Sequence, residues 1–165
     1  MRDPLDQLRS LAVDVAARSM LATWTIGGEL RSVVLMAGEA ELAVAEAAPS
    51  RLIAVDAATG TLTRQLALPH EPREVISANG GGRLAVGAVN GWLMTVDSAS
   101  FALVFQLKLA DEIRSLAWWE AGGRLLAVHK RADAVSLVDL VVPQVTASVP
   151  LDGDPDRAAV AQGPA

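Results

Sequence analysis

An all-β fold is predicted by the sequence: a β-propeller that forms a partial ring of about three and a half four-stranded antiparallel blades. Val-Asp pairs recur with a period of 41 or 42 residues and end at Asp14, Asp56, Asp97 and Asp139. Each period holds four short apolar runs separated by turn residues, and most of these runs are apolar on both faces. A repeat of roughly 40–45 residues with four strands per unit is typical of propellers.

The repeat extends well beyond the Val-Asp pairs. Residues 109–128 align without a gap on residues 26–45, at an offset of 83, and they align on the middle period once a residue is allowed in a loop. A register held over three periods is not a chance match, so the period marks a structural unit.

The middle period shows the expected strands most clearly. Its four apolar runs are REVISA, RLAVGA, WLMTVD and FALVFQLKL, and the separators are NGGG, VNG, SAS and ADE. Short runs rich in Val, Ile, Leu and Thr indicate strands, and Asn-Gly or Gly-Gly pairs supply the positive φ angles that tight hairpins need. Strands that are apolar on both faces need cover on both sides, which sheets stacked around an axis provide.

The chain is expected to form one domain over residues 1–165. With strands counted from the axis outward, the first part of the chain supplies a third and a fourth strand, and three complete blades follow. The last part supplies only the first strand of a further, incomplete blade. The expected units are residues 9–26, 30–67, 73–108, 113–150 and 156–162.

The repeated aspartates are expected to be turn residues rather than catalytic ones. Each ends the third strand of a blade, where its short carboxylate can accept hydrogen bonds from backbone N–H groups two residues later. In the stretch VDAATG, Gly60 then supplies the left-handed position that closes the hairpin.

Residues 124–160, RLLAVHKRADAVSLVDLVVPQVTASVPLDGDPDRAAV, resemble the YVTN-type β-propeller repeat, a relative of the quinoprotein-like and WD-type repeats. In that family a strand of the RLYVA kind leads through a polar loop to VSVID, an ATG-like turn, VVATIPVG and P-x-GVAV. The match covers nearly the whole chain. The chain has no Trp-Asp or Gly-His pair and lacks the Trp-rich docking motif of quinoproteins. The resemblance therefore implies the fold and little about function, and it implies that the buried hydrogen-bond network of WD repeats is missing.

Composition limits the classes of function. The chain has 165 residues, of which 52% are hydrophobic and 20% charged, as in a globular domain with a core. A net charge of −5 with scattered basic residues argues against a nucleic-acid or anionic-membrane surface. Cysteine is absent, which excludes disulfides and thiolate sites. No apolar run could span a bilayer and MRDPLDQLRS lacks the core of a signal peptide, so a cytoplasmic location is expected.

An open arc of blades would expose apolar faces and strand edges. The two ends could share one three-stranded blade in a small monomeric ring, two chains could close a larger ring around a two-fold axis, or a different polypeptide could supply the missing blades. We favour a second chain, a copy or a partner, because a four-bladed ring needs strongly splayed blades and the absent second strand would leave a gap.

No catalytic, cofactor-binding or metal-binding residue is predicted. His70 and His129 stand 59 residues apart without a ligand-spaced partner, so a metal site with Glu71 is disfavoured. The Gly-rich stretch 78–83 is interpreted as a hairpin turn, because no helical period follows it. No Gly-x-Ser-x-Gly elbow occurs, nor a His positioned near a Ser and an Asp. Of the adjacent residues Trp118 and Trp119, one is expected between blades and the other near the tunnel or an interface.

A partner-binding surface is expected on one rim, where loops join fourth to first strands and second to third strands. The mixed charge of these loops suits a protein or peptide partner. The leading hypothesis is therefore a non-catalytic scaffold for protein–protein interaction. The alternative is a propeller enzyme with its site at the ring axis, since the family resembled includes lactonase-like and quinoprotein-like rings. The candidate rim residues are His70, Glu71, Arg73, Asn90, Asp111, Glu112, His129, Lys130 and Arg131.

Overall fold

The computed structural model describes residues 9–14 and 19–160, with side chains from residue 23 onward. All regular structure in these residues is β-strand, in line with the short apolar runs of the sequence. The strands are β1 (Arg9–Asp14), β2 (Ser19–Thr25), β3 (Leu30–Leu35), β4 (Glu41–Glu46), β5 (Arg51–Asp56), β6 (Leu62–Ala67), β7 (Pro72–Ala78), β8 (Arg83–Ala88), β9 (Trp92–Asp97), β10 (Ala102–Lys108), β11 (Ile113–Trp119), β12 (Arg124–His129), β13 (Ala134–Asp139) and β14 (Gln144–Pro150).

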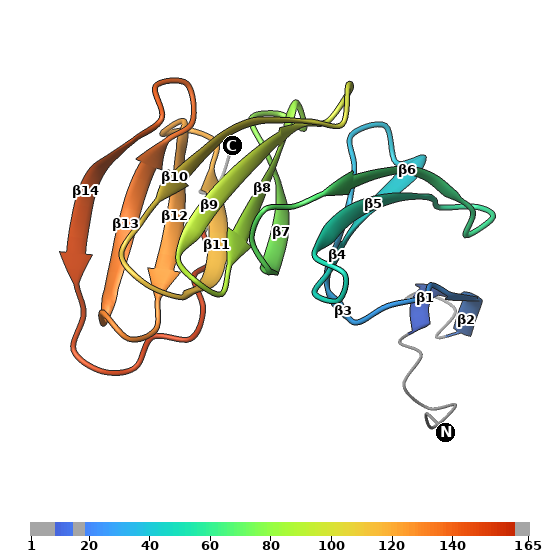
Figure 1. The fold of residues 1–165 in the computed structure, drawn as a ribbon, viewed down its shortest axis with the longest axis horizontal. Coiled ribbons are helices and arrows are strands. Elements are labelled where there is room, and N and C mark those ends of the chain that lie inside the picture. Colours follow the sequence, from blue (N-terminus) through green and yellow to red (C-terminus); the bar gives the residue numbers. More distant parts are fainter. Residues whose placement is uncertain (1–8, 15–18, 161–165) are drawn as a thin grey trace.

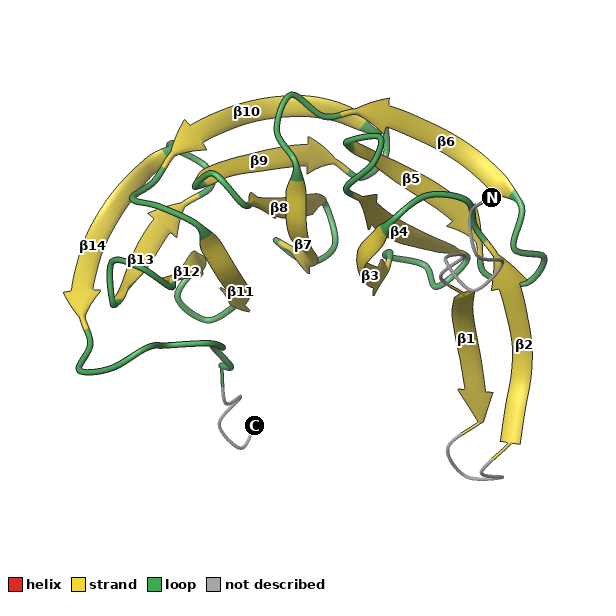
Figure 2. Ribbon diagram, turned by 60° about the horizontal axis from the view of Figure 1, so that its bottom comes forward, coloured by secondary structure: helices red, strands yellow, loops and turns green. Residues whose placement is uncertain are grey.

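These strands form three antiparallel four-stranded sheets and one two-stranded sheet. Each strand pairs with its neighbours in the chain, so the sheets are β3–β6, β7–β10 and β11–β14, while β1 pairs with β2. The sheets follow one another along an open arc (Figure 1). Figure 2 shows β3, β7 and β11 on the inside of the arc and β6, β10 and β14 on its outside. The predicted fold class, an all-β partial propeller ring, is confirmed.

The hydrophobic core lies between the sheets. One cluster joins β3–β6 to β7–β10 and includes Leu52 and Met94, and another joins β7–β10 to β11–β14 and includes Leu93 and Leu125; all four are fully buried. Leu93 and Met94 are adjacent on β9 and point to opposite faces, so this strand is covered on both sides, as its continuous apolar run predicts. Burial of each such side chain contributes about 1.5–3 kcal/mol.

The repeated aspartates form the turns that the sequence predicts. The Oδ1 atoms of Asp56, Asp97 and Asp139 each accept hydrogen bonds from backbone N–H groups two or three residues later, at 2.7–3.1 Å. Hydrogen bonds to the turn lower the pKa of all three carboxyl groups, because they favour the ionised form. Asp14 ends β1, but its side chain lies outside the described part. The N–H donors belong to Ala58, Thr59, Ser100, Val141 and Val142.

The turn after Asp56 also packs against the N-terminal strand pair. Gly60 has a φ of 72°, the left-handed conformation predicted for it. A Cβ at this position would lie only 2.1 Å from Trp24 Cδ1 at the end of β2. Glycine is therefore needed here both for the turn and for the close approach of β2.

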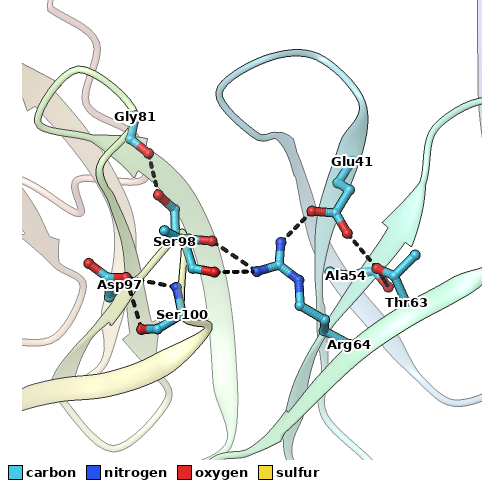
Figure 3. Close-up of polar contacts among 9 residues, drawn as sticks. Glu41, Ala54, Thr63, Arg64, Gly81, Asp97, Ser98 and Ser100 are labelled. Carbon is cyan, nitrogen blue, oxygen red and sulfur yellow. Dashed lines mark hydrogen bonds and ion pairs between the residues drawn. The ribbon is translucent and has the colours of Figure 1, made fainter.

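A polar contact joins the outer parts of two sheets (Figure 3). Arg64 on β6 forms an ion pair with Glu41 on its own sheet and donates to the carbonyl oxygens of Ser98 at 3.1 Å and Ala99 at 3.0 Å in the next sheet. Its guanidinium also lies 4.8 Å from the ring centroid of Phe101. One arginine thereby links two blades through charge, hydrogen bonds and a cation–π contact.

Among the described residues, no sheet covers one face of the last sheet. Equivalent positions in the repeat are covered in the first two complete blades and exposed in the third: Leu68 and Leu109 are 7% and 8% exposed, whereas Leu151 is 39% exposed. Two other sets show the same change: Leu66 and Leu107 pack against core clusters whereas Val149 is exposed, and Met36 and Ala78 are buried whereas Trp119 is exposed. Trp118, on the opposite face of β11, packs between the blades as predicted for one of the two tryptophans.

The first complete sheet is also partly uncovered at the other end of the arc. Val34 on β3 packs toward β7–β10, so the alternating residues Val33 and Leu35 point toward the N-terminal strand pair. Both are exposed, because β1 and β2 supply only two strands on that side. Both ends of the arc therefore present apolar side chains to solvent.

Candidate functional site

The two types of loop predicted to share one rim do lie together. In the middle blade, the amide nitrogen of Asn90 lies 3.2 Å from Nδ1 of His70, and the His70 ring stacks on Trp92 with centroids 4.8 Å apart. The backbone N–H of Val89 donates to the carbonyl oxygen of Glu71 at 3.1 Å, which joins the same two loops.

The last blade repeats this arrangement. The backbone N–H of Lys130 donates to the Glu112 carbonyl oxygen at 3.4 Å, and Arg131 is exposed on the loop that follows β12. The Glu112 carboxylate lies 3.7 Å from the guanidinium of Arg114. The rim therefore carries histidine, amide, acidic and basic groups from adjacent blades.

His129 does not belong to the exposed rim as predicted. Its side chain is fully buried at the end of β12, because the loop that contains Asp111 covers it. Nε2 lies 2.9 Å from Ser136 Oγ, and Nδ1 lies 3.4 Å from the Asp111 carbonyl oxygen and 3.6 Å from Asp111 Oδ1. Burial lowers the pKa of His129, because desolvation disfavours the charged ring.

The expectation that no His lies near a Ser and an Asp is wrong. Asp111, His129 and Ser136 lie together, but Asp111 Oδ1 has no hydrogen-bond partner among the described residues, the serine is only 4% exposed and the histidine is not exposed at all. A substrate carbonyl cannot reach Ser136 Oγ in this arrangement. The three residues instead tie the loop before β11 to β12 and β13. This blade thus has a buried hydrogen-bond network of its own, although the resemblance implied that the WD-type network is missing.

A related buried pair lies in the first complete blade. Glu46 ends β4 at the position that His129 occupies on β12, and it is fully buried in an ion pair with Arg51. Its Oε1 atom has no hydrogen-bond partner. The sequence signal for the Glu46 and His129 contacts was a polar residue at the end of the second strand of a blade, in two blades that lie two periods apart.

A cavity of about 550 Å³ opens between the inner strands of the arc. The second residue of each inner strand is an arginine, and Arg31, Arg73 and Arg114 all line the cavity together with Arg157 from the segment after β14. Figure 2 shows β3, β7 and β11 on the inner side of the arc, and residues of all three strands line the cavity. Of these four arginines, the sequence analysis selected only Arg73, as a rim residue. For Arg31 and Arg114 the signal was present, because they share one phase of the repeat with Arg73, whereas Arg157 lies one residue beyond that phase.

The inner strands β3, β7 and β11 and the segment after β14 are linked by one recurring contact. The backbone N–H of Val75 donates to Ser32 Oγ at 3.2 Å, and that of Leu116 donates to the Glu74 carboxylate. The backbone N–H of Ala158 donates to Ser115 Oγ at 3.4 Å. Residues 156–160 thus lie beside β11 as β11 lies beside β7, although no strand is assigned to them, and residues 161 and 162 of the expected strand lie outside the described residues.

Two searches of the described residues concern metal ligands and membrane-spanning helices. Within them, no group of three or more His, Asp or Glu side chains is arranged to hold a metal ion. His70 and His129 have different partners. In the same part of the chain, no helix has the length and apolar character needed to cross a bilayer.

Comparison with known proteins identifies the fold. No protein-family model matches the sequence, and a search of curated proteins finds no match. Similar solved structures include Kuenenia stuttgartiensis hydrazine synthase, with a TM-score of 0.77 and 14% identity over 85% of this chain and 42% of that one. The Neurospora crassa Pan2 WD40 domain has a TM-score of 0.71 and 12% identity over 92% and 49% of the two chains, and U3-55K has 0.71 and 11% over 79% and 42%.

The fold is that of a β-propeller. At these identities the similarity concerns the fold alone. The chain spans less than half the length of each of the three structures. The finer resemblance to YVTN repeats has no matching family model and stays a prediction.

Proposed function

We propose that this chain is a non-catalytic β-propeller scaffold for protein–protein interaction, and that a second copy of the chain completes its ring. The observation that carries this proposal is the exposure of Leu151, Val149 and Trp119 on the last sheet, at positions that are covered in the other blades. Apolar sheet faces of this kind mark interaction surfaces.

The extent of the arc favours a second copy as the occupant. The chain matches 42–49% of the length of each similar structure, so two copies together have close to the length of one such chain. Each arc would then place its last sheet against the N-terminal strands of the other, around a two-fold axis.

Light scattering coupled to size-exclusion chromatography tests the assembly. The native chain is expected to have twice its 17.2 kDa mass, and the double variant Val149→Glu with Leu151→Glu is expected to be monomeric. Val104→Glu is the matched control, because Val104 is as exposed as Val149 but lies on the outer strand of the middle blade. A native chain that stays at 17.2 kDa at all concentrations contradicts the second copy.

The rim is the second part of the proposal. His70, Asn90, Lys130 and Arg131 come from adjacent blades on one rigid frame, and their mixed chemistry suits a protein or peptide partner. Joint substitution of Lys130 and Arg131 by alanine is expected to weaken capture of a partner protein by the immobilised chain.

A control for the rim uses two arginines that begin second strands. Arg83 and Arg124 form ion pairs with Asp97 and Asp139 at the turns that follow the third strands, away from the rim loops. Their joint substitution by alanine removes the same charge and is expected to leave capture unchanged. Equal capture by the native chain and by the Lys130 and Arg131 variant would remove this surface from consideration.

Among the described residues, no group of side chains specifically supports the enzyme alternative. In the set of Asp111, His129 and Ser136 the histidine and the serine are buried, and the set acts as a structural tie. We therefore keep the scaffold as the proposed function.

A further inference from the structure

The arginines at the axial cavity differ in how their charge is balanced. Arg31 is paired with Glu29 at 2.9 Å and with Glu71 at 3.1 Å. Arg114 is paired with Asp156 at 2.6 Å and lies 3.7 Å from Glu112. The hydrogen bond and charge of Arg114 hold the pKa of the Asp156 carboxyl below its usual value, as in a close ion pair. Two of the four arginines thus each have two carboxylate partners within the chain.

The other two arginines lack such partners. Arg73 and Arg157 form no ion pair with any described residue, although they lie 84 positions apart in sequence and line the same cavity. Both act on the Glu74 carboxylate only through longer-range attraction. Glu74 itself accepts the backbone N–H of Leu116, and its pKa is raised because burial outweighs these favourable contacts.

Most arginines in the described side chains have carboxylate partners. Besides the two paired ones at the cavity, they are Arg51, Arg64, Arg83 and Arg124. Arg131 is the exception outside the cavity, and it lies exposed on the rim. Arg73 is half-buried and Arg157 is exposed, so the two unpaired guanidinium groups at this cavity are accessible to a ligand.

We propose that the axial cavity binds a single carboxylate group between Arg73 and Arg157. Arg73 and Arg157 are the lining guanidinium groups that form no ion pair with a described residue, and a bound carboxylate would supply the partner that they lack. Arginine presents a planar set of N–H donors that matches the two oxygens of a carboxylate. The cavity volume lies within the range of small-ligand sites, about 300–1,000 Å³.

The carboxylates around the cavity disfavour anions of higher charge. A phosphate dianion would place two negative charges near the half-buried Glu74, and Coulomb repulsion at short range is costly in such a setting. Glu29, Glu71 and Glu112 lie near the cavity through their contacts with its arginines, and they would repel a polyanion such as a nucleic acid. The site therefore selects a monoanionic carboxylate.

This carboxylate has two possible sources with the same chemistry: a free small carboxylic acid, or an acidic side chain in a peptide segment. The proposal does not depend on the rim or on assembly, because the lining residues come from one copy of the chain. Failure of the rim or dimer experiments would therefore leave it standing.

NMR titration of the full chain tests the site, with the Nε–H signals of the arginine side chains as the readout. The probes are sodium acetate, the peptide acetyl-Gly-Glu-Gly-amide, its Gln counterpart and sodium phosphate, all at constant ionic strength. We expect acetate to shift the Arg73 and Arg157 signals saturably and the Gln peptide to leave them unchanged. Saturation by acetate alone assigns a small acid as the source, and saturation by the Glu peptide as well assigns a side chain; both uphold the site.

Three variants make the assignment specific. Arg73→Gln and Arg157→Gln are each expected to weaken acetate binding about tenfold, since a charged hydrogen-bond partner is lost. Arg131→Gln removes the same charge outside the cavity and is expected to change nothing. Arg157 lies outside the strands, so its variant tests the site even where Arg73→Gln impairs folding. Unsaturable shifts with acetate, tighter binding of phosphate, or an equal effect of Arg131→Gln each overturn the proposal.

Discussion

Alanine in place of Gly87 tests the packing between the second and third complete sheets. Gly87 is buried on β8, and a Cβ built on it would lie 2.7 Å from Cγ2 of Ile113 and 3.4 Å from Cδ1 of Leu116. The equivalent residues in the other blades are Ala45 and Val128, so the strand itself accepts a side chain at this position. What forbids it here is Ile113 on the next blade.

The expected magnitude comes from two opposing effects. Replacing a strand glycine by alanine gains about 0.5–1 kcal/mol, because the unfolded chain loses conformational freedom. Overpacking a filled core costs about 1–3 kcal/mol. The steric cost wins, so Gly87→Ala is expected to lower the free energy of unfolding by about 0.5–2 kcal/mol, which corresponds to a fall of roughly 2–6 °C in Tm for a chain of this size.

Urea unfolding followed by circular dichroism and tryptophan fluorescence measures this change. Gly27→Ala is the matched control, because a Cβ there meets no atom within 4 Å, and it is expected to be neutral or stabilising. Ile113→Ala alone is expected to cost about 2–5 kcal/mol, and the double variant less than the sum of the single ones by about 1 kcal/mol or more. Additive effects, or a Gly87→Ala variant as stable as the native chain, would refute the packing argument.

Three further substitutions test other contacts. Arg64→Met is expected to lower the free energy of unfolding by about 1–2 kcal/mol in urea titrations, because one side chain links two blades, whereas Arg131→Met is expected to be neutral. His129→Gln tests a pH effect: burial lowers the pKa of His129, so only the unfolded chain gains this proton as the pH falls through about 6.5. Below that pH, the free energy of unfolding of the native chain decreases by up to about 1.4 kcal/mol per pH unit. The His129→Gln variant should lack this contribution to the pH dependence of stability between pH 7.5 and 5.5. Asp97→Ala is expected to lower Tm. Asp97→Asn is expected to lower it less, because the amide oxygen can still accept a hydrogen bond from the Ser100 N–H. Equal Tm values for the native chain and both variants would contradict the turn role.

The sequence predicted those parts of the fold that depend on local rules. Asp56, Asp97 and Asp139 form the predicted turns because their carboxylates reach only to the next few backbone groups. The all-β architecture followed from runs too short and too apolar on both faces for helices, as with Leu93 and Met94.

Contacts made across blades were not predictable in the same way. His129 looked like a loop residue, and its burial depends on a loop 18 positions earlier folding over it. Leu68, Leu109 and Leu151 are the same residue type at the same repeat position, and only the presence or absence of a neighbouring blade separates them. Arg31 and Arg114 were missed because a charged residue near the start of a strand usually faces solvent; the phase that they share with Arg73 was the available signal.

The recurring contact from Ser32 to Val75, from Glu74 to Leu116 and from Ser115 to Ala158 has a consequence for ring size. Each contact fixes the position of one inner segment relative to the next and involves no residue further along the chain. The curvature of the arc is therefore a sum of identical local steps, as in other stacked-repeat architectures. A chain engineered to carry one additional 42-residue unit should extend the same curve by one step, with its existing interfaces undisturbed.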